Sequence, residues 1–285
     1  MSLTDIEWTD ITWNVVSGCD KVSAGCRNCY ASPTAHRLAG NPNPKVAAAY
    51  AGVTERTGAA APTWTGLVRC LPARLALPFS LTQPSKIFVN SMSDLFHRDV
   101  PLEFLARVFE VMAACPWHVF QILTKRAGRL AALAPELPRP PNVWMGVSVE
   151  DEDARWRVDC LRRVPAAVRF LSCEPLLGPL PLDLTGIGWV ITGGESGPGA
   201  RPFDPAWAAA IRDTCRAAGV PLLHKQNGGR NKKKTGRELD GRLHDEFPQY
   251  TPPPVPPKHV REALVRQLVP EASTSVDRIA LSVVK

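Results

Sequence analysis

Short apolar runs alternate with helical patterns along the first 250 residues of this chain, and this alternation strongly restricts the folds open to it. The runs that we expect to be strands are rich in Val, Ile, Leu and Phe, which is typical of strands buried on both faces. They lie at residues 11–16, 86–90, 118–124, 143–149, 168–172, 189–192 and 220–224. Helical patterns lie between most of them, at residues 30–38, 102–114, 126–133, 150–163 and 205–218.

A strand followed by a helix, repeated, predicts parallel β/α units joined by right-handed crossovers. Roughly six to seven such units predict a parallel (β/α) barrel, complete or partial, related to the (β/α)8 architecture. The alternative is a doubly wound open sheet. We expect the barrel domain at residues 1–250, with an insertion rich in Ala, Gly, Pro and Thr at residues 40–66. Residues 251–285 form a Pro-rich linker and a C-terminal tail.

Composition and charge favour a cytoplasmic protein with a polyanionic partner. No apolar run approaches the roughly 18 residues that span a bilayer, so we expect no membrane segment. Asp5, Glu7 and Asp10 stand where a secretory signal would carry positive charge. With 34 Lys and Arg against 27 Asp and Glu, the net charge is +7, which favours a polyanionic partner such as nucleic acid; the alternative is a solvated basic face without a partner. The 8 cysteines then predict reduced thiols at a metal or catalytic site.

Three of these cysteines form a cluster. Cys19, Cys26 and Cys29 give the pattern C-x6-C-x2-C, directly after the first predicted strand and before the first predicted helix. Three thiolates on one loop can face a single metal centre. They leave one position of a [4Fe-4S] cluster open to another ligand, whereas electron-transfer clusters use four cysteines. The alternative is a zinc site, which needs a fourth ligand such as His36 or a distant cysteine.

Polar or small residues follow nearly every predicted strand. In a parallel barrel the carboxyl ends of the strands open onto one face, so these residues should meet the cysteine loop there. We therefore expect the active site at this mouth, with catalytic roles for Asp94, Lys125, Glu150 and Glu174. A structural role is the alternative for some of them, because Asp94 can cap a turn and Glu150 can favour a helix N-terminus.

Several segments resemble the phage-associated three-cysteine-motif family, which is described as radical S-adenosylmethionine-like. They are TWNVVSGC at 12–19, GCRNCYA at 25–31, FVNSMSDLFH at 88–97, ILTKR at 122–126, WMGVSVE at 144–150, LSCEPLLG at 171–178 and VITGGESG at 190–197. The resemblance covers residues 6–248 and extends, more distantly, to radical enzymes of the spore photoproduct lyase type. Most radical S-adenosylmethionine enzymes have a C-x3-C-x2-C pattern, so the first gap of this chain is longer.

The resemblance implies that Cys19, Cys26 and Cys29 hold a [4Fe-4S] cluster whose open iron is chelated by S-adenosylmethionine. An electron from a donor such as flavodoxin or ferredoxin would then cleave the cofactor to a 5'-deoxyadenosyl radical, which abstracts hydrogen from a substrate. We expect the cofactor to contact strand-end residues and a Gly-rich turn that can hold an anion through its amides. These residues are Tyr30, Asn90, Ser91, Ser93, Ser148, Gly193, Gly194 and Glu195.

A basic segment follows the last predicted strand, with no acidic residue before Glu238. Its cations are expected to contact a phosphate backbone through counterion release, and the alternative is a solvated loop. They are Lys225, Arg230, Lys232, Lys233, Lys234 and Arg237. We therefore expect a nucleic acid or nucleotide substrate, in repair or modification. Two other functions stay open: a zinc-stabilised nucleic-acid-binding protein without catalysis, and a degenerate barrel that serves as a partner-binding subunit.

Overall fold

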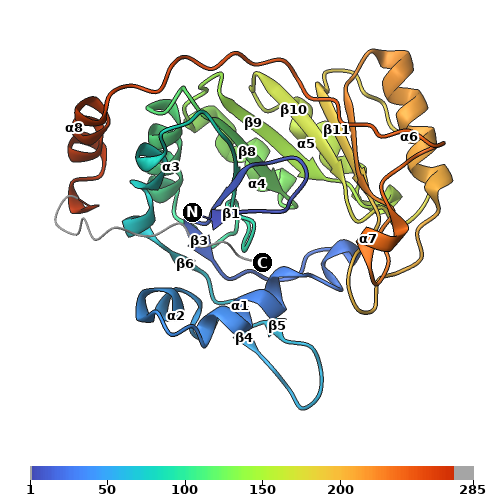
Figure 1. Cartoon of the computed structure of the whole chain (residues 1–285), viewed down its shortest axis with the longest axis horizontal. Helices are drawn as coiled ribbons and strands as arrows, with labels where there is room; N and C mark the ends of the chain where they lie inside the picture. The colour runs from blue at the N-terminus through green and yellow to red at the C-terminus, as the bar shows by residue number, and fades with distance from the viewer. Residues whose placement is uncertain (1, 273–285) are drawn as a thin grey trace.

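The structure is a computed structural model that describes residues 2–272. It is an α/β fold in which a sheet with seven parallel strands curls into a half-barrel (Figure 1). The parallel strands are β2 (Ile11–Trp13), β7 (Lys86–Val89), β8 (Val119–Thr124), β9 (Val143–Ser148), β10 (Val168–Cys173), β11 (Trp189–Gly193) and β12 (Leu222–Gln226). A short strand, β1 (Ser2–Leu3), pairs antiparallel with β2 at one edge.

The strand order shows which of the two expected architectures is present. Across the sheet the strands follow chain order, from β1 and β2 through β7 to β12. A doubly wound sheet reverses its strand order at a switch point, so the alternative of a doubly wound sheet is wrong. Within the described part of the chain, β1 and β12 are the two edges of this sheet and do not pair with each other. The barrel is therefore partial.

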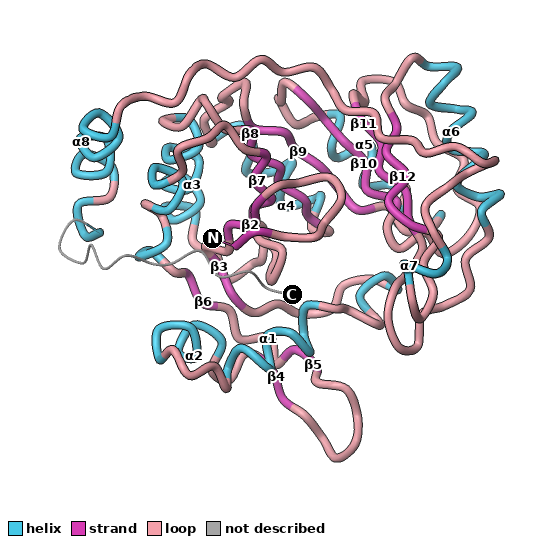
Figure 2. Tube along the Cα trace, in the orientation of Figure 1, coloured by secondary structure: helices cyan, strands magenta, loops and turns pink. Residues whose placement is uncertain are grey.

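Helices follow the strands and cover the convex face of the sheet (Figure 2). They are α3 (Leu102–Ala113), α4 (Ala127–Leu133), α5 (Trp156–Arg162) and α6 (Pro205–Ala218), and their apolar side chains form one core with the strands. The boundaries of α6 are as expected: Asp204 caps it by accepting a hydrogen bond from the Ala206 N–H at 2.9 Å, and Gly219 ends it with φ 66°. The helix expected over 150–163 is divided into the 3-10 turn η5 (Glu152–Ala154) and α5.

The concave face changes from apolar to polar along the strands. Near the start of the strands it carries a packed aromatic cluster made of Trp8, Phe88, Trp144, Phe170 and Trp189. Side chains alternate between the faces of a sheet, so positions two or four residues later face the same side. Asn90, Ser148 and Ser172 occupy these positions and are buried above the aromatic cluster. The fold thus places polar groups at the carboxyl ends of the strands.

The remaining described elements lie between β2 and β7, between α4 and β9, or after β12. The expected insertion at 40–66 contains α2 (Pro44–Tyr50) and the paired strands β4 (Thr54–Glu55) and β5 (Thr63–Trp64), which pack against α1 (Ala31–Ala39). The others are β3 (Val16–Ser17), β6 (Arg69–Cys70), α7 (Lys232–Thr235), α8 (Lys258–Leu268), η1 (Ala24–Cys26), η2 (Pro72–Arg74), η3 (Leu77–Ser80), η4 (Ala134–Glu136) and η6 (Pro270–Ala272). Of the linker and tail expected at 251–285, residues 273–285 lie outside the described residues. No described helix has the length and apolar character needed to cross a membrane.

Gly146 offers a test of the packing inside the half-barrel. It lies opposite Phe170 in the β9–β10 register, and a Cβ at this position would come within 2.3 Å of the Phe170 ring. The ring is fully buried beside Trp189. We expect Gly146→Ala to lower the free energy of unfolding by about 1 to 3 kcal/mol through overpacking, as measured by chemical denaturation.

The matched control is Gly128→Ala in α4. A Cβ there would meet nothing within 4 Å, and Ala is the better helix former. We expect this variant to gain up to about 1 kcal/mol in unfolding free energy. An equal loss of stability in both variants would contradict the close packing of Phe170 against β9.

Candidate functional site

A cavity of about 210 Å3 opens at the carboxyl ends of the parallel strands, and Cys19, Cys26 and Cys29 all line it. Most of the expected site residues line the same cavity: Tyr30, Asn90, Ser91, Ser93, Asp94, Lys125, Ser148, Glu174, Gly194, Glu195 and Lys225. Glu150 lies directly behind Lys125, at 2.7 Å from its Nζ. The cavity lining does not include the expected residues Gly193, Arg230, Lys232, Lys233, Lys234 and Arg237.

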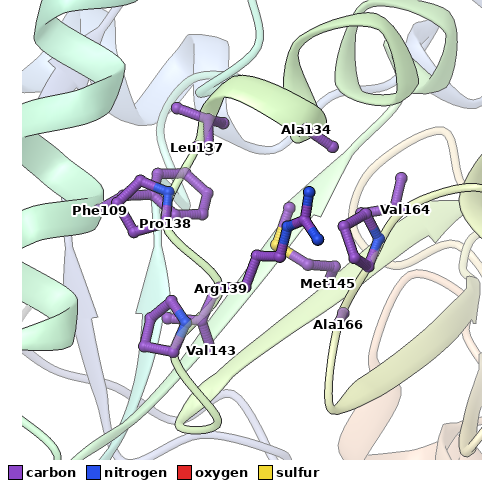
Figure 3. Close-up of a pocket in the computed structure, with 11 residues that line it drawn as sticks. Phe109, Ala134, Leu137, Pro138, Arg139, Val143, Met145, Val164 and Ala166 are labelled. Atoms are coloured by element: carbon purple, nitrogen blue, oxygen red, sulfur yellow. The ribbon is translucent and has the colours of Figure 1, made fainter.

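A second hollow lies away from this mouth and has a different character. It measures about 20 Å3 and lies between α3, η4 and the start of β9. Its lining is formed by Phe, Leu, Val, Met, Ala and Pro side chains, and the side chain of Arg139 crosses it (Figure 3). Because this hollow is small and lies far from the strand ends with polar groups, we place the functional site at the larger cavity.

Glu195 and Arg201 hold the cysteine loop in place. The Arg201 guanidinium donates to both carboxylate oxygens of Glu195, at 2.6 and 2.9 Å, and also to the Ala24 carbonyl at 3.0 Å. Asn28 donates to the same carboxylate at 2.9 Å. Burial alone would raise the pKa of Glu195, but these hydrogen bonds lower it below its usual value. Glu195, expected to contact a cofactor, thus fixes residues beside Cys26 and Cys29, and no local sequence signal points to Arg201.

Glu150 holds the other side of the cysteine loop from a fully buried position. Its carboxylate pairs with Lys125 at 2.7 Å and Arg157 at 2.8 Å, and it accepts a hydrogen bond from Ser23 at 2.8 Å. Burial would raise the pKa of Glu150, but the two cations outweigh this effect and lower it. A Cβ on Gly25 would come within 2.5 Å of the carboxylate, so the loop needs glycine there to approach Glu150.

Arg126 connects the first cysteine to Asp94. One guanidinium nitrogen lies 2.9 Å from the Asp94 carboxylate and 3.8 Å from the Cys19 sulfur, and another contacts Asp20. The Asp94 carboxylate also accepts hydrogen bonds from the Thr124 hydroxyl and the Lys125 N–H, at 2.6 and 3.1 Å. Burial and the Asp94 charge raise the pKa of the Cys19 thiol to about 12, while Arg126 acts in the opposite direction. Arg126 directly follows Lys125 at a strand end, which is the sequence signal that could have identified it.

The three polar residues after β7 differ in whether their side-chain hydrogen-bonding groups already have partners. Ser93 donates to the Val16 carbonyl at 2.9 Å, and Ser91 bonds to the Asn14 amide at 3.2 Å. Asn90 adopts φ 67°, and its Oδ1 accepts hydrogen bonds from the N–H groups of residues 15 and 16. Its Nδ2 is buried without a partner in residues 2–272. Of these three residues, Asn90 has a donor ready for a molecule in the cavity.

The basic segment is only partly free to bind a partner. Lys225 pairs with Glu174 at 2.5 Å, Lys232 pairs with Glu7 at 2.9 Å, and Arg237 pairs with Asp245. The other three expected cations, Arg230, Lys233 and Lys234, are exposed, and their side chains have no ion-pair partner among the described residues. The structure thus divides the expected nucleic-acid-binding set into neutralised and unpaired cations.

The three cysteine thiols share one cavity, and their donor type is the basis for comparing a cluster with a single ion. No group of three or more His, Cys, Asp and Glu residues within residues 2–272 is placed to hold one metal ion. Thiolates on one tetrahedral zinc lie about 4 Å apart, since each Zn–S bond is about 2.3 Å, whereas the ligands of a cubane bind different irons. His36 hydrogen-bonds to Thr54 at 3.2 Å and does not line the cavity. The three cysteines are free of disulfides and line one cavity, so thiol donors of the type that a cluster uses are available there.

The fold and site define an α/β half-barrel protein with a cysteine-lined cavity at the carboxyl ends of its parallel strands. The chain belongs to the family described as Protein of unknown function (DUF5131), whose model matches residues 3–248. This match includes all seven parallel strands of the half-barrel and every residue named above as lining the cavity. Neither the comparison with curated proteins nor that with solved structures found a match.

Glu150 offers a test of how the site is held together. We expect Glu150→Gln to lower the free energy of unfolding by about 3 kcal/mol, because Lys125 and the buried Arg157 then lose their counter-charge. Urea denaturation followed by circular dichroism measures this loss.

Glu152→Gln is the matched control, two residues further along. Glu152 is 57% exposed and pairs with Arg155 at 3.0 Å, so its replacement should change the unfolding free energy by less than about 1 kcal/mol. If both variants lost the same amount, the buried pairs of Glu150 would not be what stabilises the mouth.

Proposed function

We propose that this protein is a radical S-adenosylmethionine enzyme that acts on a nucleic acid or nucleotide, in repair or modification. The observation that supports this proposal is the common position of Cys19, Cys26 and Cys29 on one cavity at the strand carboxyl ends. When bound, a [4Fe-4S] cluster with one open iron would supply one electron for breaking the sulfonium C–S bond of S-adenosylmethionine, with methionine leaving and a 5'-deoxyadenosyl radical remaining. We assign Cys19, Cys26 and Cys29 as its ligands.

The chain's own residues prepare the cysteine loop for such a group. Glu195 with Arg201 and Glu150 with Ser23 fix the loop from two sides, so little conformational freedom is lost on binding. Arg126 lies 3.8 Å from the Cys19 sulfur, and its charge partly offsets the burial and the Asp94 charge, which raise the pKa of Cys19 and favour the neutral thiol over the thiolate that binds metal. The carboxylate of Asp94 is occupied by Arg126 and its neighbours, so we assign it a positioning role in place of proton transfer.

Other residues present polar groups to a cofactor or substrate in the cavity. Asn90 offers a buried donor, and Lys125 offers a cation whose charge is balanced by Glu150 behind it. Ser148 lies beside them on the concave face. We propose that these groups orient S-adenosylmethionine and the reacting part of the substrate, while the aromatic cluster below excludes water. An electron donor such as flavodoxin or ferredoxin would approach from the outer side of the partly exposed cysteine loop.

Anaerobic reconstitution with iron and sulfide tests the proposal. We expect about four irons and four sulfides per chain in the wild type. Cys26→Ala should lose most of this content, because the cluster then has only two thiolate ligands. Cys70→Ala is the matched control: Cys70 is a free cysteine in β6 that does not line the cavity, so its replacement should leave iron and sulfide unchanged.

The same preparation separates the alternatives. Uptake of about one metal ion per chain, in colourless protein, would assign the cysteines to zinc and overturn the proposal. A reconstituted protein that holds its iron but leaves S-adenosylmethionine intact after reduction with dithionite would also contradict it. Equal iron loss in the Cys26 and Cys70 variants would show that the cavity thiols are not the ligands.

A further inference from the structure

Three loop segments, residues 20–30, 195–201 and 227–236, form one continuous layer beside the cavity mouth; we call it the rim layer. Asn28 donates to the Gly199 carbonyl at 2.9 Å, which joins the first segment to the second. Gly229 donates to the Glu195 carbonyl at 2.7 Å, which joins the third segment to the second. Figure 1 shows the loop before α1 extending toward α7, in agreement with these bonds. Segments far apart in the sequence therefore present one surface.

Unpaired cations cover this rim layer. Five exposed side chains in it have no ion-pair partner within the described residues: Lys21, Arg27, Arg230, Lys233 and Lys234. The acidic residues of the three segments are Asp20 and Glu195, and both are paired, with Arg126 and Arg201 respectively. The rim layer is thus positively charged outside the cavity, whereas Lys125 and Lys225 inside it are each neutralised by a carboxylate.

Tyr30, the last residue of the first rim segment, supplies an aromatic surface at the cavity mouth. Its side chain is 56% exposed although it lines the cavity, and its hydroxyl donates to the Ser91 carbonyl at 3.0 Å. This hydrogen bond fixes the tyrosine at the mouth while leaving its ring accessible. An exposed aromatic ring and unpaired cations on the same surface are the combination by which proteins bind single-stranded nucleic acids, through stacking on bases and attraction of phosphates.

We infer that the rim layer binds the phosphate backbone of a single-stranded nucleic acid, with one base stacked on Tyr30 and directed into the cavity. A base has to leave the helical stack to reach a recessed site, which favours a single strand over a duplex. The inference rests on the proposed nucleic acid substrate and narrows it. In the set of cations expected to contact phosphates, it removes Lys225, Lys232 and Arg237, which are paired with carboxylates. It adds Lys21 and Arg27 of the cysteine loop.

Fluorescence anisotropy with labelled 15-nucleotide single strands of DNA and of RNA, at a series of salt concentrations, tests this inference. Each phosphate contact contributes about −0.7 to the slope of log K against log salt for single strands. We therefore expect Lys21→Gln with Arg27→Gln to make the slope less negative by about 1.4 and to weaken binding. The matched control is Lys258→Gln with Arg266→Gln on α8, which removes the same charge from another element and should leave the slope unchanged.

Tyr30 is tested with two substitutions. Tyr30→Leu should weaken single-strand binding about tenfold or more through loss of stacking. Tyr30→Phe keeps the ring and loses the hydrogen bond to Ser91, so its affinity should stay within about threefold of the wild type. An equal loss in both variants would contradict a stacking role.

Other results would overturn the inference directly. If the double substitution in the rim layer and the double substitution on α8 weakened binding equally, the attraction would depend on the net charge of the protein and not on the rim layer. If a duplex bound as tightly as a single strand, the assignment of a single-stranded partner would be wrong. If polyglutamate bound more tightly than the single strands, the surface would be assigned to an acidic polypeptide. Nucleic acid binding by the rim layer requires no cluster, so a failure of the binding experiment would not change the result expected for iron and sulfide content. Conversely, protein that contains no iron can still show the predicted salt dependence.

Discussion

The buried carboxylate of Glu150 is the constraint on which the mouth of the half-barrel depends. It is fully removed from water, so it requires the counter-charges of Lys125 and Arg157. The same carboxylate accepts a hydrogen bond from Ser23 and leaves no room for a side chain at Gly25. One buried charge thereby connects β8, β9 and α5 to the loop that carries the three cysteines.

Cations at this mouth have two distinct roles. Those that line the cavity or lie behind it, such as Arg126 and Lys225, are paired with carboxylates and fix the positions of strand ends and the cysteine loop. Within the rim layer, Arg201 and Lys232 are also paired, whereas Lys21, Arg27, Arg230, Lys233 and Lys234 are exposed and have no ion-pair partner among the described residues. Ion pairs in the cavity are less screened by water and salt than exposed charges, which suits positioning, whereas exposed cations are free to exchange counterions for phosphates. A net charge of +7 alone does not reveal this division.

The sequence predicted the parallel β/α order and the course of α6 because both depend on local signals. Apolar runs and their turns give the strands, while Asp204, Pro205 and Gly219 determine the ends of α6 through capping and backbone conformation. It also predicted that the cysteines and strand-end residues would meet, since parallel strands in one sheet share a carboxyl edge. The division of 11–16 into β2 and β3 was not predictable in this way, because β3 pairs with β6, more than 50 residues later.

By itself, then, the sequence determined the strand and helix order and the cysteine trio that the strand ends surround. Tertiary structure decided that the barrel stays open. It also decided the ion pairs of Glu195 with Arg201 beside the cysteine loop and of Lys225 with Glu174. These outcomes depend on which chain segments become neighbours in space. A local pattern records propensity and periodicity, but the partner of a buried charge is chosen by the packing of the whole sheet.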